Sequence, residues 1–389
     1  MKIFFFAPFC LLRPTTNRIF DVRLCDALTG RNADVHLLYP FYSMKENIGE
    51  EEIEKVYDTR QPVQFRMLRT RLSEKSPGAW QSLVLISCFS WCLLKIIFSG
   101  KTNLSQTVFM SRDHKLLLPV VVLRKLSFGF FSSKIVINVH EVKEDRLSKW
   151  LYRNYDAIWT TTPAAKEKIR LAMNIPEEKF QSIGACLPPA TVISKTEARR
   201  RINYSGEQPL VVYTGKLGRG IKELEYILDA AALLPAYRFL FTGGKEDTLA
   251  YMNRLCADRN LANVIFSGFI KEVSDVRDYQ CAADVLVSYY SAKDHKVEFN
   301  LPQKLMEYMF SQNPIVTPDF PASRPFINAR TARIVKPDDP HALAEGIRDV
   351  VGNKELASQL AAGAFHAAKE LTFEKKSVAL MESLTNMTR

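Results

Sequence analysis

Residues 300–309 read Asn-Leu-Pro-Gln-Lys-Leu-Met-Glu-Tyr-Met, and this stretch decides the interpretation of the whole chain. It predicts a loop that turns directly into a helix. Pro302 suits a first helical position, where its missing N–H is not needed. Leu301, Leu305, Met306 and Met309 then recur at helical spacing and give the helix an apolar face.

The start of this helix has the chemistry to hold a nucleotide. Free backbone N–H groups at Asn300–Gln303, together with the positive end of the helix dipole, attract phosphate. Glu307 lies about one turn further along, where a carboxylate can accept hydrogen bonds from a ribose. The alternative is an amphipathic surface helix in which Glu307 pairs with Lys304 at i,i+3.

Apolar strand-like runs alternate with helical patterns along both halves of the chain, which predicts two doubly wound parallel α/β sheets. In the first half we expect helices at 18–28, 115–126 and 163–173, and strands at 3–7, 35–39, 108–110, 135–139 and 157–160. In the second half we expect a helix at 223–234 and strands at 210–214, 239–242, 264–266, 285–288 and 315–317.

A chain of 389 residues is too long for one ordinary core, and the patterns divide it into two domains. We expect a first Rossmann-like domain at 1–188, a polar and basic linker at 189–208, and a second Rossmann-like domain at 209–371. The segment 372–389, helical from Phe373 to Leu384, lies beyond the second pattern.

The net charge of +11 is unevenly distributed. Residues 1–190 hold 27 basic and 18 acidic side chains, whereas residues 191–389 hold 26 and 24. A basic first half suggests an anionic partner such as a membrane surface or a phosphorylated acceptor, or else a charge that only maintains solubility. No recognition motif accompanies the charge, which argues against nucleic acid. The seven cysteines have no metal-type spacing.

Residues 79–98 form the most apolar stretch of the chain, preceded by Arg66, Arg69, Arg71 and Lys75. Lys95 and several serines interrupt the stretch, and its continuous apolar part falls short of the roughly 20 residues that span a bilayer. We expect a buried helix of the first domain. The alternative is an interfacial helix that docks on anionic lipid.

Glycines and cations follow the strands of the second domain. Gly215, Lys216 and Arg219 come directly after the strand at 210–214, and Gly243-Gly244 end the next strand. Ligands bind at the carboxyl ends of parallel strands, and two cations on a glycine turn can reach a diphosphate there. A solvated basic turn is the alternative.

His140 and Arg112 end two neighbouring strands of the first domain. A histidine in that position can hydrogen-bond to a substrate hydroxyl, although a structural histidine would fit as well. Arg112 can line the same site or pair with Asp113. The chain contains no Asp-x-Asp motif of the kind that holds a metal–diphosphate, so we expect no metal and no cofactor.

With these residues in view, the chain resembles the family 4 glycosyltransferases, which have two Rossmann-like domains and retain anomeric configuration. Tyr213–Lys216 with Arg219-Gly220 is similar to the family's diphosphate-gripping turn, and Gly243-Gly244 is similar to its next glycine turn. Leu301-Pro302 to Glu307 resembles the donor helix, which implies that Glu307 binds the ribose. His140 matches the histidine that contacts the transferred sugar. The last helix resembles one that crosses back to the first domain.

Two features depart from the family pattern. The first glutamate of the family's Glu-x7-Glu motif would fall on Phe299, so either Glu298 takes its catalytic role or the first carboxylate of the motif is absent from this chain. The glycine-rich loop of the first domain is replaced by residues 9–18, which place Arg13 and Thr16 beside Arg112 on the acceptor side.

The resemblance implies an enzyme that moves a sugar from a nucleotide-sugar donor to a saccharide or lipid-linked saccharide. We expect it to act in polysaccharide or glycolipid synthesis, in the cytoplasm at the inner face of the membrane. Two alternatives remain open. One is a non-catalytic, membrane-associated scaffold or partner subunit with the same fold. The other is a non-hydrolysing sugar-nucleotide epimerase, which needs acid and base carboxylates that are not evident in the sequence.

Overall fold

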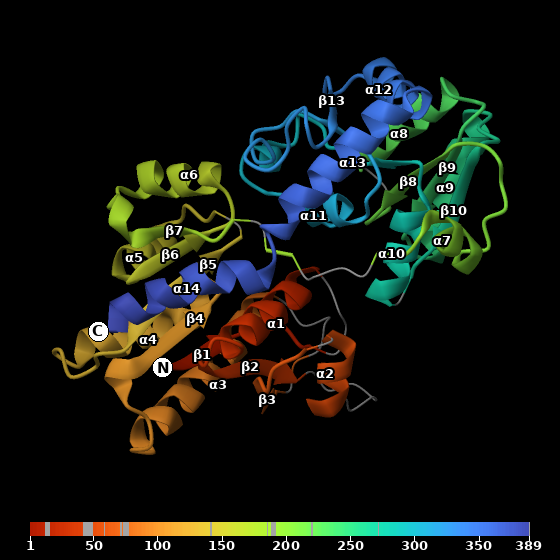
Figure 1. The fold of residues 1–389 in the computed structure, drawn as a ribbon. Coiled ribbons are helices and arrows are strands. Elements are labelled where there is room, and N and C mark those ends of the chain that lie inside the picture. The colour runs from red at the N-terminus through yellow and green to blue at the C-terminus, as the bar shows by residue number, and fades with distance from the viewer. Residues whose placement is uncertain are drawn as a thin grey trace. The chain divides into compact units, whose positions relative to one another are not determined.

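The chain forms two compact units, each built on its own parallel sheet (Figure 1). The first unit comprises Met1–Pro188 with Thr372–Arg389, and the second comprises Pro189–Leu371. The computed structural model describes residues 1–388 except 12–15, 42–49, 58, 71, 73–77, 141, 185, 188–191, 219–220 and 271.

The first unit has a seven-stranded sheet in the order β3-β2-β1-β4-β5-β6-β7, with every neighbouring pair parallel. Its strands are β1 (Lys2–Phe6), β2 (Asp34–Phe41), β3 (Gln64–Arg69), β4 (Thr107–Ser111), β5 (Lys134–Val139), β6 (Ala157–Thr160) and β7 (Phe180–Ser182). Its helices are α1 (Thr16–Thr29), α2 (Glu50–Tyr57), α3 (Gly78–Phe98), α4 (Leu118–Leu126), α5 (Arg146–Asn154), α6 (Pro163–Met173) and α14 (Phe373–Thr388), with short 3-10 turns η1 (Leu104–Gln106), η2 (His114–Leu117) and η3 (Glu177–Lys179).

Two helical layers cover the two faces of this sheet. Alternate residues of β1 point to opposite faces, so Ile3 and Phe5 pack with α1, α2 and α14, whereas Phe4 and Phe6 pack with α3, α4, α5 and α6. A strand buried on both faces must be apolar throughout, and for that reason the sequence alone predicted β1. Phe373 N donates to Leu187 O at 3.1 Å, and α14 then packs on α1. The last helix therefore belongs to the first unit.

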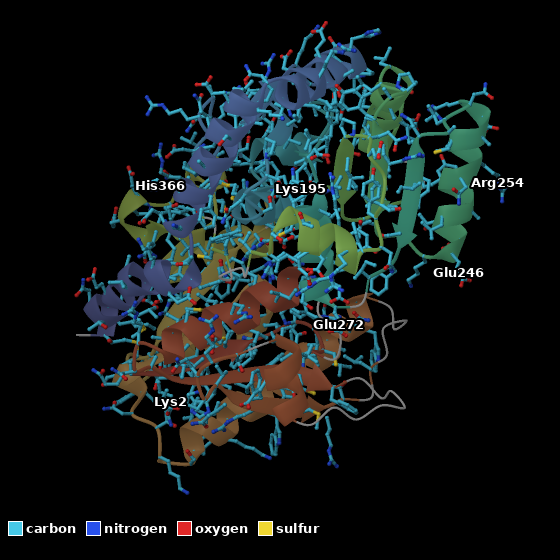
Figure 2. All side chains as sticks on the ribbon, turned by 45° about the vertical axis from the view of Figure 1, so that its right-hand side comes forward. Lys2, Lys195, Glu246, Arg254, Glu272 and His366 are labelled. Carbon is cyan, nitrogen blue, oxygen red and sulfur yellow. The ribbon has the colours of Figure 1, made fainter. Side chains whose placement is uncertain are left out.

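The second unit has a six-stranded parallel sheet in the order β10-β9-β8-β11-β12-β13. Glu246 and Arg254 of its helix α9 (Glu246–Asp258) point away from the sheet (Figure 2). Its strands are β8 (Leu210–Thr214), β9 (Arg238–Thr242), β10 (Val264–Gly268), β11 (Val285–Val287), β12 (Ile315–Pro318) and β13 (Arg333–Val335). Its helices are α7 (Lys195–Arg201), α8 (Lys222–Ala232), α9 (Glu246–Asp258), α10 (Val273–Ala282), α11 (Gln303–Phe310), α12 (Pro340–Gly352) and α13 (Lys354–Lys369), with the 3-10 turn η4 (His295–Glu298).

The two parallel, helix-covered sheets confirm the predicted α/β fold class. The range 189–208, expected as a linker, contains the helix α7, which packs on α10 within the second unit. A short helix with a highly charged sequence gives little apolar periodicity, which explains why the sequence did not reveal it.

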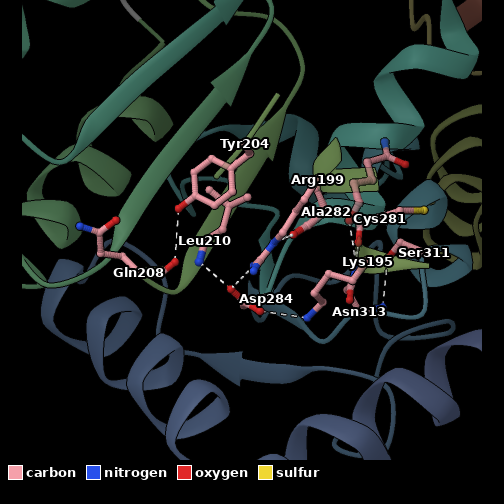
Figure 3. A network of polar contacts seen from close by, with 11 residues as sticks. Lys195, Arg199, Tyr204, Gln208, Leu210, Cys281, Ala282, Asp284, Ser311 and Asn313 are labelled. Carbon is pink, nitrogen blue, oxygen red and sulfur yellow. Dashed lines mark hydrogen bonds and ion pairs between the residues drawn. The ribbon is translucent and has the colours of Figure 1, made fainter. Parts of the chain in front are cut away.

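Asp284, at the entry to β11, fixes α7 to the sheet (Figure 3). Its carboxylate accepts hydrogen bonds from Lys195 Nζ at 2.9 Å, from Arg199 at 2.6 Å and from the backbone N–H of Leu210 at 2.7 Å. Burial raises the pKa of Asp284, but these three donors outweigh it and hold that pKa below its ordinary value. One acid thus joins α7, β8 and β11.

Candidate functional site: the carboxyl edge of the second sheet

The turns after β8 and β9 pack against each other at the carboxyl edge of the second sheet. Gly215 N donates to Thr242 O at 3.0 Å. Gly243 has a φ of +130°, and a Cβ there would lie 2.1 Å from Gly215 O. Only glycine fits at 243. The direct structural effect of this glycine is to let the two turns meet.

Lys304, in the first turn of α11, lies over the Gly215 turn. Its Nζ donates to the Tyr213 hydroxyl at 2.6 Å and lies 3.9 Å from the centre of the Tyr213 ring and 5.3 Å from that of Tyr290. A Cβ on Gly215 would approach this Nζ to 2.9 Å. Burial lowers the pKa of Lys304 to about 7, against the opposing effect of Glu223 and Glu307. The site therefore holds an amine that gains or loses its proton near neutral pH.

Glu307 follows one turn later on the same helix and is half-buried. Gln280 Nε2 donates to its Oε2 at 3.4 Å and to Thr214 Oγ1 at 3.3 Å. Burial raises the pKa of Glu307, although Gln280, Arg277 and Lys304 oppose the rise. The hydrogen bonds of Lys304 and Glu307 thus go to β8 and α10 rather than to each other, which does not favour a simple i,i+3 surface pair.

Tyr308 anchors α11 to the sheet, and the sequence did not single it out. Its hydroxyl accepts from Thr214 N at 2.8 Å and from Thr214 Oγ1 at 3.2 Å. This bond fixes the rotation of α11, so that the neighbouring Glu307 faces the end of β8. Tyr213, Tyr290 and Gln280 were also missed, because their contacts join segments that are far apart in sequence.

The helix α11 begins one residue later than the sequence predicted, since Pro302 was expected at its first position. Pro302 caps the helix, which begins at Gln303, and Leu305 N donates to Pro302 O at 3.2 Å. Asn300 Oδ1 is buried and has no hydrogen-bond donor among the described residues. Leu301 is half-buried, whereas Glu298, at the end of η4, is exposed. Asn300 is thus an acceptor that a ligand hydroxyl can satisfy.

The structure describes some, but not all, of the remaining residues predicted to bind the diphosphate. Lys216 is exposed, and its carbonyl accepts from the Tyr213 hydroxyl at 3.4 Å. Gly244 has a φ of +82° in the turn after β9. Arg219 lies outside the described residues. The second unit therefore places Gly215, Gly243, Gly244, Lys304 and Glu307 along one sheet edge.

The candidates of the first unit lie at the ends of β4 and β5. His140 follows β5, and its ring packs edge-to-face on Phe20, with 4.6 Å between ring centres. Burial and the charge of Arg112 hold the pKa of His140 well below its ordinary value, so its imidazole is neutral at pH 7. Its Nε2 is buried and has no partner among the described residues.

Arg112 pairs with Asp21 of α1 rather than with Asp113. Its guanidinium lies 3.3 Å from Asp21 Oδ1 and donates to Asn17 O at 2.8 Å, and both charged side chains are buried. Burial raises the pKa of Asp21 to about 7, although Arg112 opposes the rise. Thr16 begins α1, but its side chain and the whole of Arg13 lie outside the described residues. This geometry holds the Arg112 guanidinium against α1 at that edge.

Both units are helix-covered parallel sheets, and in the second the glycine turns and the start of α11 lie along one sheet edge. Residues 208–353 match the family described as Glycosyl transferases group 1. A sequence comparison with curated proteins finds no match. The family match confirms that the second unit carries a glycosyltransferase domain and that the predicted enzyme class was correct.

Solved structures of similar fold extend over the whole chain. Sucrose-phosphate synthase from Thermosynechococcus elongatus is 16% identical with a TM-score of 0.76, covering 99% of this chain and 98% of its own. HepE from Anabaena, solved with UDP, is 13% identical with a TM-score of 0.73, covering 99% and 100%. A glycosyltransferase from Rickettsia africae is 13% identical with a TM-score of 0.72, covering 100% and 98%. These likenesses confirm the fold of both units.

Proposed function

We propose that the chain is a retaining glycosyltransferase that moves a sugar from a nucleotide-sugar donor to a saccharide or a lipid-linked saccharide. The observation that carries the proposal is the position of Lys304 and Glu307 in adjacent turns of α11, at the edge formed by Gly215 and Gly243. A cation for the diphosphate and a carboxylate for the ribose are thus presented together. Anabaena HepE, of similar fold, was also solved with UDP-glucose.

In this proposal Glu307 accepts hydrogen bonds from the ribose hydroxyls. Lys216, Arg219, Lys304 and the backbone N–H groups at the start of α11 stabilise the diphosphate as it leaves. Preorganised charges of this kind commonly supply the largest share of catalysis. No metal is needed, because the cations belong to the protein.

Retention of the anomeric configuration requires the acceptor oxygen to attack the anomeric carbon from the same face that the leaving diphosphate vacates. The acceptor oxygen bonds to the anomeric carbon while the bond to the diphosphate oxygen breaks, and the acceptor proton passes to that oxygen. In this proposal His140, which is neutral at pH 7, hydrogen-bonds a hydroxyl of the transferred sugar. Glu298 and Thr16 with Arg13 and Arg112 remain proposed contacts on the sugar and acceptor sides.

We also propose that the reaction takes place in the cytoplasm at the inner face of a membrane, in polysaccharide or glycolipid synthesis. The supporting observations are the basic first half and the apolar helix α3, which together suit a lipid-linked acceptor. Among the neighbours of similar fold is a lipopolysaccharide outer core galactosyltransferase, WaaB.

Screening nucleotide sugars for slow hydrolysis without acceptor tests the proposal. One donor should be hydrolysed, and it should raise the melting temperature, since a ligand at 100 times its Kd stabilises by about 2.7 kcal/mol. Retention is then checked by NMR of the glycoside product, which should keep the donor's anomeric configuration. A protein that no nucleotide sugar stabilises would instead be the scaffold, and interconversion of sugar epimers would indicate the epimerase.

A further inference from the structure

The helix α3 has two apolar stripes on opposite sides. Leu85, Phe89, Leu93 and Ile96 form the inner stripe and are buried in the core over the first sheet. The outer stripe consists of side chains that are 39–82% exposed, namely Trp80, Leu83, Trp91, Leu94 and Phe98. At 100° per residue the two stripes lie about 180° apart. A core helix of a water-soluble unit needs only the inner one.

The outer stripe continues onto the other helices of the same layer. Sixteen large hydrophobic side chains are exposed among the described residues, and twelve of them lie on α3–α6 or in the loop after α4. The most exposed are Phe128 at 93% and Phe130 at 90%, just beyond the end of α4. Among the described residues of α1, α2 and α14, on the other face of the sheet, Val378 is the one exposed large hydrophobic side chain. The apolar surface is therefore confined to one side of the first unit.

Positive charge accompanies this surface. Residues 78–134 contain seven basic side chains and a single acidic one, Asp113. Lys95, Lys101 and Lys125 are exposed, and Lys95 Nζ lies 5.3 Å from the ring centre of Trp91. Exposed tryptophan and phenylalanine flanked by lysine are typical of a surface that enters the interface of an anionic bilayer.

The buried stripe determines how such a surface can meet a membrane. The helix α3 has 21 residues, and its most apolar 18-residue window has a mean hydropathy of 1.8, so it is long and apolar enough to span. Spanning would remove Leu85, Phe89 and Leu93 from the core against the first sheet. We therefore propose that the α3–α4 surface, here defined as Trp80, Leu83, Trp91, Leu94, Phe98, Leu126, Phe128 and Phe130, docks in the plane of an anionic lipid bilayer. This inference rests on the proposed membrane-linked function and names the surface responsible.

The tryptophans of the chain allow a direct test. There are four, of which Trp80, Trp91 and Trp150 are exposed on this layer, whereas Trp159 is fully buried. The full-length protein is mixed at low salt with vesicles of phosphatidylglycerol and phosphatidylcholine that carry brominated acyl chains. Brominated lipid should quench the exposed tryptophans, with a loss of quenching in the double variant Trp91→Ser/Phe98→Ser.

Matched variants separate the contribution of the apolar side chains to vesicle binding from that of the lysines. Val378→Ser, on the opposite layer, should bind vesicles like the parent protein. Lys95→Gln/Lys101→Gln/Lys125→Gln should reduce binding at low salt by at least about tenfold, because each lysine near an anionic surface adds attraction. High salt should reduce binding of the parent protein similarly.

Two results would overturn the inference. One is the absence of quenching with anionic vesicles at low salt. The other is a parent protein that is dimeric by analytical ultracentrifugation and becomes monomeric in Trp91→Ser/Phe98→Ser, because the surface would then bind a second copy. Donor hydrolysis is measured in parallel and should be unchanged in these variants. Vesicle binding without any response to nucleotide sugars would refute the proposed function but not the docking surface.

Discussion

At the scale of single residues, Glu307 is the most informative position. Its carboxylate accepts from Gln280 at the long distance of 3.4 Å, which leaves it capacity to accept from a ribose. Glu307→Gln keeps the shape and removes the charge, and charge-assisted hydrogen bonds are roughly twice as strong as neutral ones. We expect donor affinity or kcat/KM to fall at least about tenfold, with little change in melting temperature.

Isothermal titration with the donor measures this loss, and Glu298→Gln on the exposed η4 end is the companion variant. Unchanged donor affinity in Glu307→Gln would show that the ribose is held elsewhere. A fall in kcat for Glu298→Gln with unchanged donor affinity would support its proposed role at the sugar.

Lys304 predicts a pH dependence of donor binding. Its pKa of about 7 reflects burial, while Glu223 and Glu307 favour the charged form and the rings of Tyr213 and Tyr290 cover the amine. A bound diphosphate favours the protonated amine and therefore raises this pKa. Donor affinity should be level below pH 7 and fall above it by up to about tenfold per pH unit, until the pH reaches the pKa of the complex.

Lys304→Met keeps the apolar stem and removes the proton site, so its affinity should be weaker and level between pH 7 and 9. A nucleotide sugar is the right ligand, because its diphosphate does not titrate in this range. If the parent and the Met variant show the same slope, another group causes the pH dependence.

At the scale of elements, the sequence predicted those whose burial follows from their own pattern. Parallel strands such as β1 and β8 are covered on both faces, so they are continuous apolar runs whatever their neighbours are. The bond between Tyr308 and Thr214 joins α11 to β8 and depends on which strands become neighbours, which no local pattern contains. The outer stripe of α3 could not be predicted for the same reason: sequence periodicity identifies an apolar face of a helix but not what covers that face.

The helix α7 offers a prediction at this scale. Replacing Asp284 by Ala leaves Lys195 and Arg199 without their shared acceptor and removes the acceptor of the Leu210 N–H. We expect a loss of about 1–3 kcal/mol in the free energy of unfolding of the second unit, the range for a polar group left unpaired. Because Asp284 is partly exposed, the lower part of this range is expected.

The pH dependence of this loss provides the check. The pKa of Asp284 is lower in the folded chain than in the unfolded one, so its stabilisation is complete above the unfolded value of about 3.9. It disappears as the pH falls through the folded pKa. Urea unfolding at pH 7 should therefore separate the parent from Asp284→Ala, and the difference should shrink in acid. A difference that persists below both pKa values would indicate lost packing instead.

At the scale of the whole molecule, the two units differ in net charge and in the surface features that they carry. The first holds the surplus of basic side chains and the α3–α4 surface, whereas the second, nearly neutral, holds the glycine turns and the helix α11. The match to Glycosyl transferases group 1 lies within the second unit. A donor site could be proposed from the sequence because a diphosphate site requires particular residues at particular strand ends, whereas an acceptor site follows the shape of its acceptor.

The distribution of charged groups over the whole chain also predicts how the diphosphate is neutralised. No group of three or more histidine, cysteine or acidic side chains with the arrangement of a metal site occurs among the described residues. The carboxyl edge of the second sheet instead carries Lys216 and Lys304, and in the proposed reaction these cations take over the charge of the leaving diphosphate. We therefore expect initial rates of sugar transfer to be the same within about twofold in EDTA and in excess Mg²⁺ or Mn²⁺. Lys216→Met should lower kcat by at least about tenfold under both conditions. A rate that EDTA abolishes and Mg²⁺ or Mn²⁺ restores would require a metal at this edge and would contradict the assignment of these lysines.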